Sequence, residues 1–366
     1  MDVRAIVLVA PRPDGAERLG DMPIALLDVL GRSVLQRVVD RMRGFAISAI
    51  TVLGDVEATA LRVLPQALED DLRWVRVPGA DLWWAAQQVF ANYAQSGAEF
   101  VVVTRVGPYS EIDYDALLQS HLEGNSRITA VSDAGGQSLD TFVVSAARRD
   151  DADFLLQHQL RQSRVPCLPY RFTGYGNRLA TAADLRQLAV DSFDGCARIV
   201  PAGEQIRPGI WAGAGARIQR GARILAPAFI GARVQIGAAA VITRGSVLEH
   251  HVRVNCGTVV EDSTLLPYTS VGAGLDVAHA VVGFRRFTSL PRRTEIEIFD
   301  SKLVGYVLPA RLRALGCAVS LFARLPSKLT RGWGRNGAAP ELSPVPPASS
   351  EALSKSGSLP VATGRD

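Results

Sequence analysis

Cysteine is scarce in this sequence and never occurs in closely spaced pairs. The four cysteines lie far apart, at Cys167, Cys196, Cys256 and Cys317. Such spacing indicates neither a zinc site nor a disulfide framework. We therefore expect buried thiols in a reducing compartment.

Long apolar runs are also missing. No uninterrupted apolar stretch reaches the roughly 20 residues that a membrane-spanning helix needs. The short apolar run near the N-terminus has no cleavage site behind it, so it is interpreted as a first strand and not as a signal peptide. We expect a cytoplasmic protein, with a membrane-peripheral location as the open alternative.

Charge of one sign is not concentrated in the globular part of the chain. Lys and Arg number 40 against 36 Asp and Glu, for a net charge of +4. No block of basic residues interleaved with aromatic residues occurs there, so we expect no nucleic-acid partner. A chain of 366 residues exceeds one ordinary core, which predicts two domains plus extensions.

A six-residue apolar repeat dominates residues 206–266. Apolar residues recur at every sixth position: Ile206, Ala212, Ile218, Ile224, Ile230, Ile236, Ile242, Leu248, Val254, Val260 and Leu266. Two places before most of them stands a small or β-branched residue: Ala216, Ala222, Ala228, Val234, Ala240, Ser246, Val252, Thr258 and Thr264. This period is the signature of a parallel β-helix, in which the repeated side chains point inward and stack between coils.

The first 200 residues alternate between apolar runs and amphipathic segments. This alternation predicts an α/β domain whose parallel or mixed sheet is covered by helices on both faces. Ser33 is the expected N-cap of its first helix. Expected strands lie at 4–9, 47–53, 73–77, 99–104, 127–131 and 141–145, and expected helices at 57–69, 82–93, 114–122, 152–162 and 182–193.

The chain beyond the repeat changes character twice. The predicted boundaries are 1–200 for the α/β domain, 201–284 for the β-helix, 285–335 for a capping strand with a basic helical segment, and 336–366 for a disordered tail. The capping strand is expected at 295–302. Residues 303–324 mix apolar residues with Arg311, Arg313 and Arg324, so this segment either packs along the coils or lies on anionic lipid.

Several local segments resemble the sugar-1-phosphate nucleotidyltransferases, the family of mannose-1-phosphate guanylyltransferases and glucose-1-phosphate nucleotidyltransferases. The segments are AIVLVA, PIALLDVLGRSVLQRVVDRM, EFVVVT, IDYDALLQSHLE, LATAADLRQL and TVVEDSTLLPYTSVGAGLDVAHAVV. The resemblance implies a Rossmann-like nucleotidyltransferase domain followed by a left-handed parallel β-helix. It also implies a homo-oligomer in nucleotide-sugar or exopolysaccharide metabolism, with Mg²⁺ as cofactor if the enzyme is active.

The catalytic motifs of that family are degenerate in this sequence. Its glycine-rich phosphate loop matches APRPDGAERL, which has Pro11 and Pro13 and a single glycine; proline has no N–H to offer a phosphate. Its lysine, its two metal-binding aspartates and its sugar-binding segment fall at Ile24, Val106-Gly107, Arg178 and Leu82-Trp83-Trp84. We therefore expect an inactive regulatory or scaffold homologue, with a divergent but active NDP-sugar pyrophosphorylase as the alternative.

Few residues remain as candidates for a site. Arg18, Arg105 and Arg178 are the candidate contacts for the phosphate of a nucleotide or sugar phosphate, and Trp83 is a candidate stacking platform for a sugar; no metal ligand is predicted.

Two alternatives belong to other functional classes. Hexapeptide acyltransferases, which the coils also resemble, use a histidine at a coil edge, and His250 or His251 would fill that place, His251 being the catalytic candidate. The second alternative is an oligomeric assembly module whose basic segment docks on a membrane or on a glycosyltransferase.

Overall fold

The computed structural model describes residues 1–9, 24–47, 49–54, 73–146, 168–283 and 285–307. The expected helices at 57–69 and 152–162, Arg18, and the basic and tail segments from residue 308 onward lie outside these ranges. Residues Met1–Leu308 form one compact unit. None of the described helices is long and apolar enough to cross a membrane.

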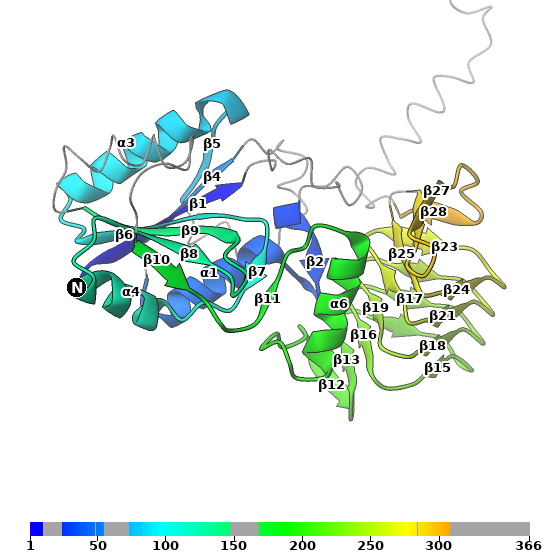
Figure 1. Cartoon of the computed structure of the whole chain (residues 1–366). Coiled ribbons are helices and arrows are strands. Elements are labelled where there is room, and N and C mark those ends of the chain that lie inside the picture. The colour runs from blue at the N-terminus through cyan, green and yellow to red at the C-terminus, as the bar shows by residue number, and fades with distance from the viewer. Residues whose placement is uncertain (10–23, 48, 55–72, 147–167, 284, 308–366) are drawn as a thin grey trace, which may run out of the picture. The chain divides into compact units, whose positions relative to one another are not determined.

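A seven-stranded sheet organises the α/β region (Figure 1). Its order is β10 (Leu168–Arg171), β8 (Ile128–Ser132), β9 (Ser138–Ser145), β6 (Phe100–Arg105), β1 (Val3–Val9), β4 (Ala49–Gly54) and β5 (Arg73–Arg76). Neighbouring strands pair in parallel except at β9, which runs antiparallel to β6 and β8. The prediction of a parallel-rich α/β sheet is confirmed.

Helices cover both faces of this sheet, because its strands carry apolar residues on both sides. Along β1, Ala5 and Val7 belong to the core that includes α1 (Val34–Gly44), α4 (Tyr114–Glu123) and α6 (Ala182–Phe193). Ile6 and Leu8 belong to the core under α3 (Leu82–Gln95). Ser33 caps α1 as predicted, since its side chain accepts the Gln36 N–H.

Two short hairpins extend the α/β region. Strands β2 (Asp28–Val29) and β3 (Arg32–Ser33) follow the 3-10 turn Ile24–Leu26 and enclose a two-residue turn. Both turn residues have positive φ, 53° at Leu30 and 84° at Gly31. Strands β7 (Tyr109–Ser110) and β11 (Gly176–Asn177) pair antiparallel beyond the carboxyl end of β6. A second 3-10 turn, Gly79–Asp81, leads into α3.

The coil region consists of short strands in three sheets, and each strand pairs in parallel with the strand 17 or 18 residues later. The first sheet contains β13 (Ile210–Ala212), β16 (Ala228–Ile230), β19 (Ser246–Leu248), β22 (Thr264–Leu265) and β25 (Ala280–Gly283). The second contains β14 (Arg217–Ile218), β17 (Gln235–Ile236), β20 (Arg253–Val254) and β23 (Thr269–Val271). The third contains β15 (Arg223–Ile224), β18 (Val241–Thr243), β21 (Val259–Glu261) and β24 (Asp276–Ala278). This pairing is consistent with the predicted β-helix.

Both ends of the predicted apolar column are wrong. Ile206 lies on β12 (Glu204–Arg207), which pairs antiparallel with β13, and it is exposed. At the other end the repeat shortens to 17 residues, because Leu248 pairs with Leu265. Leu265 is therefore the inward residue, and Leu266 joins the core shared with the α/β region.

The small-residue column shifts by the same single residue. Ser246 donates its hydroxyl to the Val260 carbonyl, and Ser263, not Thr264, makes the equivalent bond to the Val277 carbonyl. A one-residue deletion leaves the surrounding residue types unchanged, so the six-residue period of the sequence does not reveal it.

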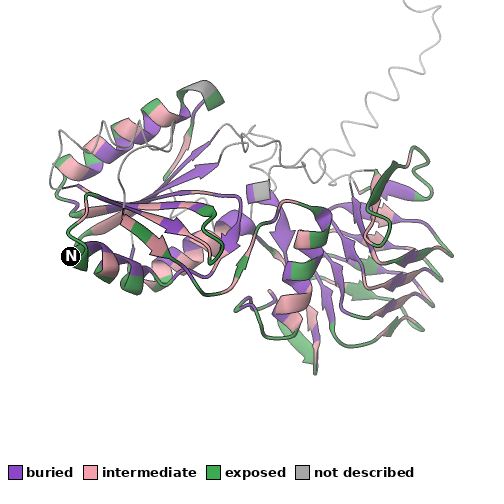
Figure 2. Ribbon diagram, in the orientation of Figure 1, coloured by how far each residue is buried: buried purple, intermediate pink, exposed green. Residues whose placement is uncertain are grey.

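The first sheet of the coils is largely buried (Figure 2), and the side chains on its outer face are mostly apolar. In the first sheet, Phe229, Val247 and Val281 face outward and are buried in the same core as residues of α1, α4 and α6. Trp211 precedes them in this outward row and stacks on Phe193 of α6 at 6.0 Å between ring centroids. This row holds the coil region against the α/β region.

Antiparallel strands cover the last coil. Strand β26 (Arg286–Ser289) pairs with β25, β27 (Thr294–Glu297) pairs with β26, and β28 (Val304–Tyr306) pairs with β23. The expected strand at 295–302 is thus shorter and is followed by a second one. The expectation of buried thiols is wrong for Cys196 and Cys256, which are both exposed.

Candidate functional site at the carboxyl edge of the sheet

A cleft of about 210 Å³ lies beyond the carboxyl ends of β8 and β10. Its lining comes from Pro108 before β7, from the turn between β8 and β9 with Leu139 of β9, and from the segment that follows β10 and runs through β11 to Arg178. The lining residues are Pro108, Asp133, Ala134, Gly135, Leu139, Phe172, Thr173, Gly174, Gly176, Asn177 and Arg178. In open sheets of this kind, ligands bind at the carboxyl ends of the parallel strands.

Arg178 has a fixed backbone and a mostly exposed side chain. On one side of it, the Asn177 side chain donates to the Asp184 carbonyl and accepts the Leu179 N–H. On the other side, Leu179 is fully buried with φ of 48°. The Arg178 side chain itself is 58% exposed. The backbone therefore positions this guanidinium at the cleft, and the guanidinium is not part of a network of hydrogen bonds that stabilises the fold.

Asp133 is the carboxylate of the cleft, and its own turn holds it. Its Oδ1 accepts the Gln137 N–H at 2.8 Å, and its Oδ2 lies 3.5 Å from Arg178 Nη2. An exposed ion pair of this length contributes about 0–1 kcal/mol. An incoming anion can therefore displace Asp133 from Arg178 at little cost.

Glycine is required beside the cleft at Gly174. A Cβ atom there would lie 2.6 Å from Cζ of Phe172, closer than real contacts allow. The missing side chain lets the Phe172 ring pack under the segment that carries Asn177 and Arg178.

Arg105 and Trp83 meet at the same edge of the sheet. Arg105 ends β6, next to β1, where the strand order changes direction. Its guanidinium lies 5.3 Å from the centroid of the Trp83 ring, a cation–π distance. Its Nε is enclosed and has no hydrogen-bond partner among the described residues. The structure thus brings two of the predicted site residues together, although neither lines the described cleft.

A divalent cation does not fit the part of this edge that the structure describes. Asp133 is the single carboxylate of the cleft lining, and a guanidinium lies beside it. Across the described ranges, no three His, Cys, Asp or Glu side chains gather closely enough to hold a metal ion. Mg²⁺ needs oxygen ligands, typically one or two carboxylates with substrate phosphates. No chemical step is therefore assigned to Mg²⁺.

A second polar cluster lies where the β2–β3 hairpin meets the coils. Glu249 is fully buried, and its carboxylate accepts the N–H groups of Leu30 at 2.7 Å and Gly31 at 2.9 Å. Burial, with the nearby Asp28 charge, raises the pKa of Glu249 to about 8 despite these bonds. Nearby, His250 Nδ1 is hydrogen-bonded to Asp28 Oδ2. These contacts fix the hairpin to the third coil.

His251 lies at a coil corner with φ of 60° and stacks on Tyr268 at 4.7 Å between ring centroids. Burial lowers its pKa to about 4, and the neighbouring His250 and Arg233 act in the same direction. Its Nδ1 and the Nε2 of His250 are enclosed without hydrogen-bond partners among the described residues. His250 thus belongs to the junction with the hairpin, His251 packs on Tyr268 within the coils, and the cleft lining includes neither histidine.

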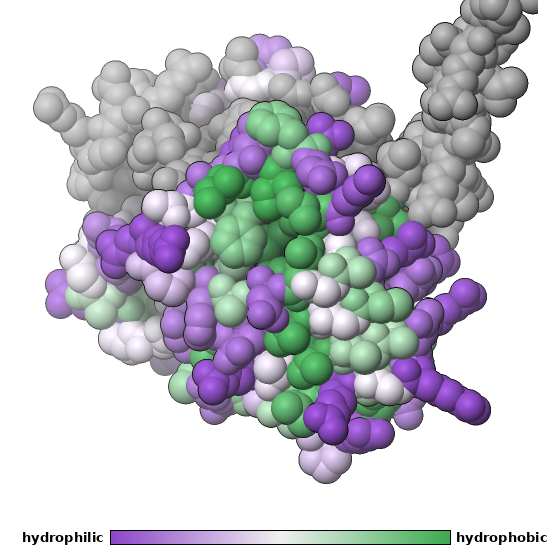
Figure 3. All heavy atoms as spheres, turned by 90° about the vertical axis from the view of Figure 1, so that its right-hand side faces the viewer, coloured by the Kyte–Doolittle hydropathy of each residue, from purple (hydrophilic) through white to green (hydrophobic). Residues whose placement is uncertain are grey.

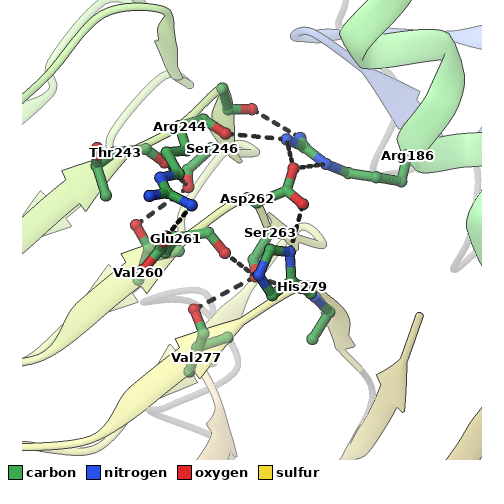
Figure 4. A network of polar contacts seen from close by, with 12 residues as sticks. Arg186, Thr243, Arg244, Ser246, Val260, Glu261, Asp262, Ser263, Val277 and His279 are labelled. Carbon is green, nitrogen blue, oxygen red and sulfur yellow. Dashed lines mark hydrogen bonds and ion pairs between the residues drawn. The ribbon is translucent and has the colours of Figure 1, made fainter. Parts of the chain in front are cut away.

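Besides the stacking of Phe193 on Trp211, helix α6 contacts the coils through Arg186 (Figure 4). Arg186 is 4% exposed; it donates to the carbonyls of Gly245 and Arg244 and to Asp262 Oδ1, the last at 2.6 Å. Asp262 Oδ2 in turn faces His279 Nδ1 at 2.6 Å. Burial opposes ionisation of Asp262, but the bonds from Arg186 and His279 outweigh it and lower the pKa of this carboxyl.

Sequence reasoning missed most partners in both clusters. Asp133 follows a strand end and precedes Ala-Gly-Gly, which is a turn signal and gives no indication of a site. Glu249 directly follows Leu248 of the inward-facing column and precedes His250. A charged residue next to that column was the signal from which sequence reasoning could have found this cluster. Nothing in the spacing joins Asp28 to His250, 222 residues later.

Comparison with known proteins adds no relative. No protein-family model matches the chain, and no curated protein matches its sequence.

Proposed function

We propose that this protein is a sugar-1-phosphate nucleotidyltransferase-like protein of nucleotide-sugar or exopolysaccharide metabolism, with a Rossmann-like domain and a left-handed β-helix. Its carboxyl-edge cleft binds a phosphate-bearing ligand without an efficient transferase reaction. The protein then acts as a regulatory or scaffold homologue of the active enzymes. The resemblance in sequence and the parallel-rich architecture support this assignment.

Arg178 carries the proposal. The resemblance puts a metal-binding aspartate at this position, and the chain has a guanidinium there, exposed, on a fixed backbone and in a cleft. A guanidinium can pair with two phosphate oxygens at once. It supplies positive charge in place of a cation, but it cannot align a nucleophile and a leaving group as a coordinated ion does.

The size of the cleft narrows the ligand class. At about 210 Å³ it is smaller than the 300–1,000 Å³ of pockets that enclose drug-sized molecules. This volume suits a sugar phosphate or the phosphoryl end of a nucleotide better than a whole nucleotide. Thr173 adds a neutral hydrogen-bonding group to the lining, as recognition of sugar hydroxyls requires.

Two assays on the full chain test the proposal. Pyrophosphate release is measured with Mg²⁺ across four nucleoside triphosphates and a panel of sugar 1-phosphates, beside an active control enzyme. Equilibrium binding of the same compounds is measured by calorimetry. We expect binding without turnover. Turnover on any pair would identify an active divergent pyrophosphorylase, and absence of both binding and turnover would refute the proposal.

Acyl transfer has weaker support. The Asp28 carboxylate orients His250 through Nδ1, as a carboxylate orients a catalytic base. Both side chains, however, lie in the junction that fixes the hairpin to the coils. Acyl-CoA turnover that disappears in His251→Ala, with the fold intact, would revive this alternative.

A further inference from the structure

The two ends of the coil region are covered to different degrees. At the last coil, β26 pairs with β25 of the first sheet and β28 with β23 of the second. At the first coil, β12 covers only β13 of the first sheet. Strands β14 and β15 stand first in the second and third sheets, and no described strand precedes either of them. Each therefore presents the unpaired side of a strand.

The backbone of Ile218 on β14 faces this unpaired side, which is here called the open edge. The N–H groups of its neighbours Arg217 and Gln219 donate to the carbonyls of Val234 and Ile236 in the second coil. Successive residues of a strand direct their backbone groups to opposite sides. The N–H and C=O of Ile218 therefore point away from the second coil, toward the place that a further strand would occupy.

The inward side chain at the open edge is uncovered as well. Ile218 is 41% exposed, whereas Ile236, which pairs with it in the second coil, is 1% exposed. The apolar interior of the coils is thus open to solvent at Ile218. Terminal units of stacked repeats normally carry a polar cap. Exposed apolar surface next to unpaired backbone groups is the kind of surface to which an extended peptide adds as a strand.

Arginines border the open edge. Arg217, Arg220 and Arg223 are exposed, and none of them forms an ion pair with another described residue. From residue 205 to residue 248 the chain contains six arginines and neither aspartate nor glutamate. Figure 3 views the coil region from the side, with the first coil lowest, and hydrophilic side chains project next to apolar ones at that end. Charge complementarity therefore favours an acidic partner.

The alternation along β14 defines the sequence pattern of that partner. Arg217 and Gln219 lie on the outer face of the strand, and Ile218 lies on the inner face. A strand added to β14 likewise directs every second side chain inward. Its inward residues have to be apolar to cover Ile218, and its outward residues have to be acidic to pair with Arg217 and Arg220.

We propose that the open edge binds an acidic segment of a partner protein, which adds to β14 as an extended strand of alternating apolar and acidic residues. Main-chain hydrogen bonds to Ile218 hold the segment, and its carboxylates pair with the arginines. A second copy of the chain fits this edge less well, because edge-to-edge pairing would bring the same arginines against one another. The proposal is independent of what the cleft binds.

Binding of a synthetic peptide to the full chain tests this proposal. The probe is a fluorescein-labelled heptapeptide of alternating glutamate and valine. Its control is a peptide of the same composition whose valines are grouped together, so that charge is kept and the alternation is lost. In fluorescence anisotropy, we expect the alternating peptide to bind at least about tenfold more tightly than the control. Added salt should weaken this binding.

Substitutions at the open edge separate the backbone contribution from the charge contribution. Ile218→Pro removes an N–H that faces away from the second coil and should weaken peptide binding at least about tenfold. Ile218→Val keeps this N–H and should bind as the unaltered chain does. Arg217→Ala/Arg220→Ala removes two exposed cations and should weaken binding about fivefold.

A matched control comes from the last coil. Arg292→Ala/Arg293→Ala also removes two exposed cations and should leave peptide binding unchanged. Thermal unfolding verifies that each variant is folded. Absence of binding by the alternating peptide, equal binding of the two peptides, or unchanged binding in Arg217→Ala/Arg220→Ala overturns the proposal. So does a dimer in light scattering that dissociates in Ile218→Pro, because a second copy would then occupy the edge.

Discussion

Two arginines of this protein, only eight positions apart, lie in opposite environments. Arg186 on α6 is buried and bonded to two carbonyls and a carboxylate of the coils. Arg178, at the cleft, is mostly exposed and has one long contact, to Asp133. Arg186 already donates hydrogen bonds from all three of its side-chain nitrogens, whereas Arg178 has nearly all of its donor capacity available to a ligand.

The same contrast separates the two regions that hold these residues. At the junction with the coils, the side chains of Glu249, Asp28 and Arg186 are hydrogen-bonded to other groups of the chain. At the carboxyl edge, the Arg178 side chain is mostly exposed and lines the cleft. Polar groups satisfied within the protein stabilise the fold, and those left available can recognise a ligand. We therefore place stability at the junction and binding at the edge.

The largest expected effect is on stability, from Arg186→Ala. Removing this side chain leaves Asp262 without its strongest partner and two carbonyls without a donor, so the free energy of unfolding should fall by about 3 kcal/mol. Urea unfolding measures it. Arg178→Ala is the matched control and should change the value by less than about 0.5 kcal/mol. Equal decreases in the free energy of unfolding in the two variants would contradict the contrast between Arg186 and Arg178.

The second largest effect on stability is expected at the turn between β2 and β3. In Gly31→Ala, the new Cβ would lie 2.8 Å from Cζ of Phe229 and 2.9 Å from Cβ of Ala202, at φ of 84°. We expect a loss of about 2 kcal/mol in unfolding free energy from strain and overpacking.

Gly97→Ala separates these two causes, since Gly97 has φ of 93° with nothing within 4 Å of its Cβ position. That variant should lose only the conformational part, about 1 kcal/mol. A loss as large as that of Gly31→Ala would show that packing against Phe229 is unimportant.

A smaller effect appears in the pH dependence of stability. The pKa of Glu249 is about 8 in the folded protein, against 4.5 for an ordinary glutamate. The folded state thus holds a proton that the unfolded state releases, so stability from this group decreases as pH rises from about 4.5 to 8. His251 acts oppositely: burial lowers its pKa to about 4, and its contribution is lost as pH falls below about 6.5.

Glu249→Gln isolates the contribution of Glu249 to this pH dependence. Its unfolding free energy, measured in urea at about pH 5 and about pH 8, should lack the decrease seen in the unaltered chain. Asp28, His250 and Arg37 surround Glu249 in both proteins, so their direct contributions largely cancel in the comparison. An unchanged slope in Glu249→Gln would mean that Glu249 is ionised when folded.

The sequence predicted the repeated features of the fold and missed the unrepeated ones. Period six predicted the inward residues from Ile230 to Val260, because many equivalent positions reinforce one pattern. The repeat shortens to 17 residues from Leu248 to Leu265 and again from Leu265 to Val282. The first shortening moved Leu266 to another core. The outward row with Phe229 was missed because the repeat describes only what points inward.

The candidate site was predictable in part for a similar reason. Trp83 and Arg178 stood out because they occupy motif positions, and Arg105 because it adjoins one; the structure brings Arg105 and Trp83 into contact. Glu249 is bonded to residues that are distant in the sequence, and Asp133 is held by its own turn. A single sequence does not show which residues form such pairs.

Titration calorimetry of glucose 1-phosphate and mannose 1-phosphate into the full chain tests the central claim most directly. Arg178→Ala should weaken binding about tenfold or more, as expected for a lost charge-assisted contact. Arg207→Ala, which removes an exposed arginine from β12, should leave it unchanged, and unphosphorylated glucose should not bind. Equal affinity in Arg178→Ala and the unaltered chain would contradict the assignment of binding to the carboxyl edge.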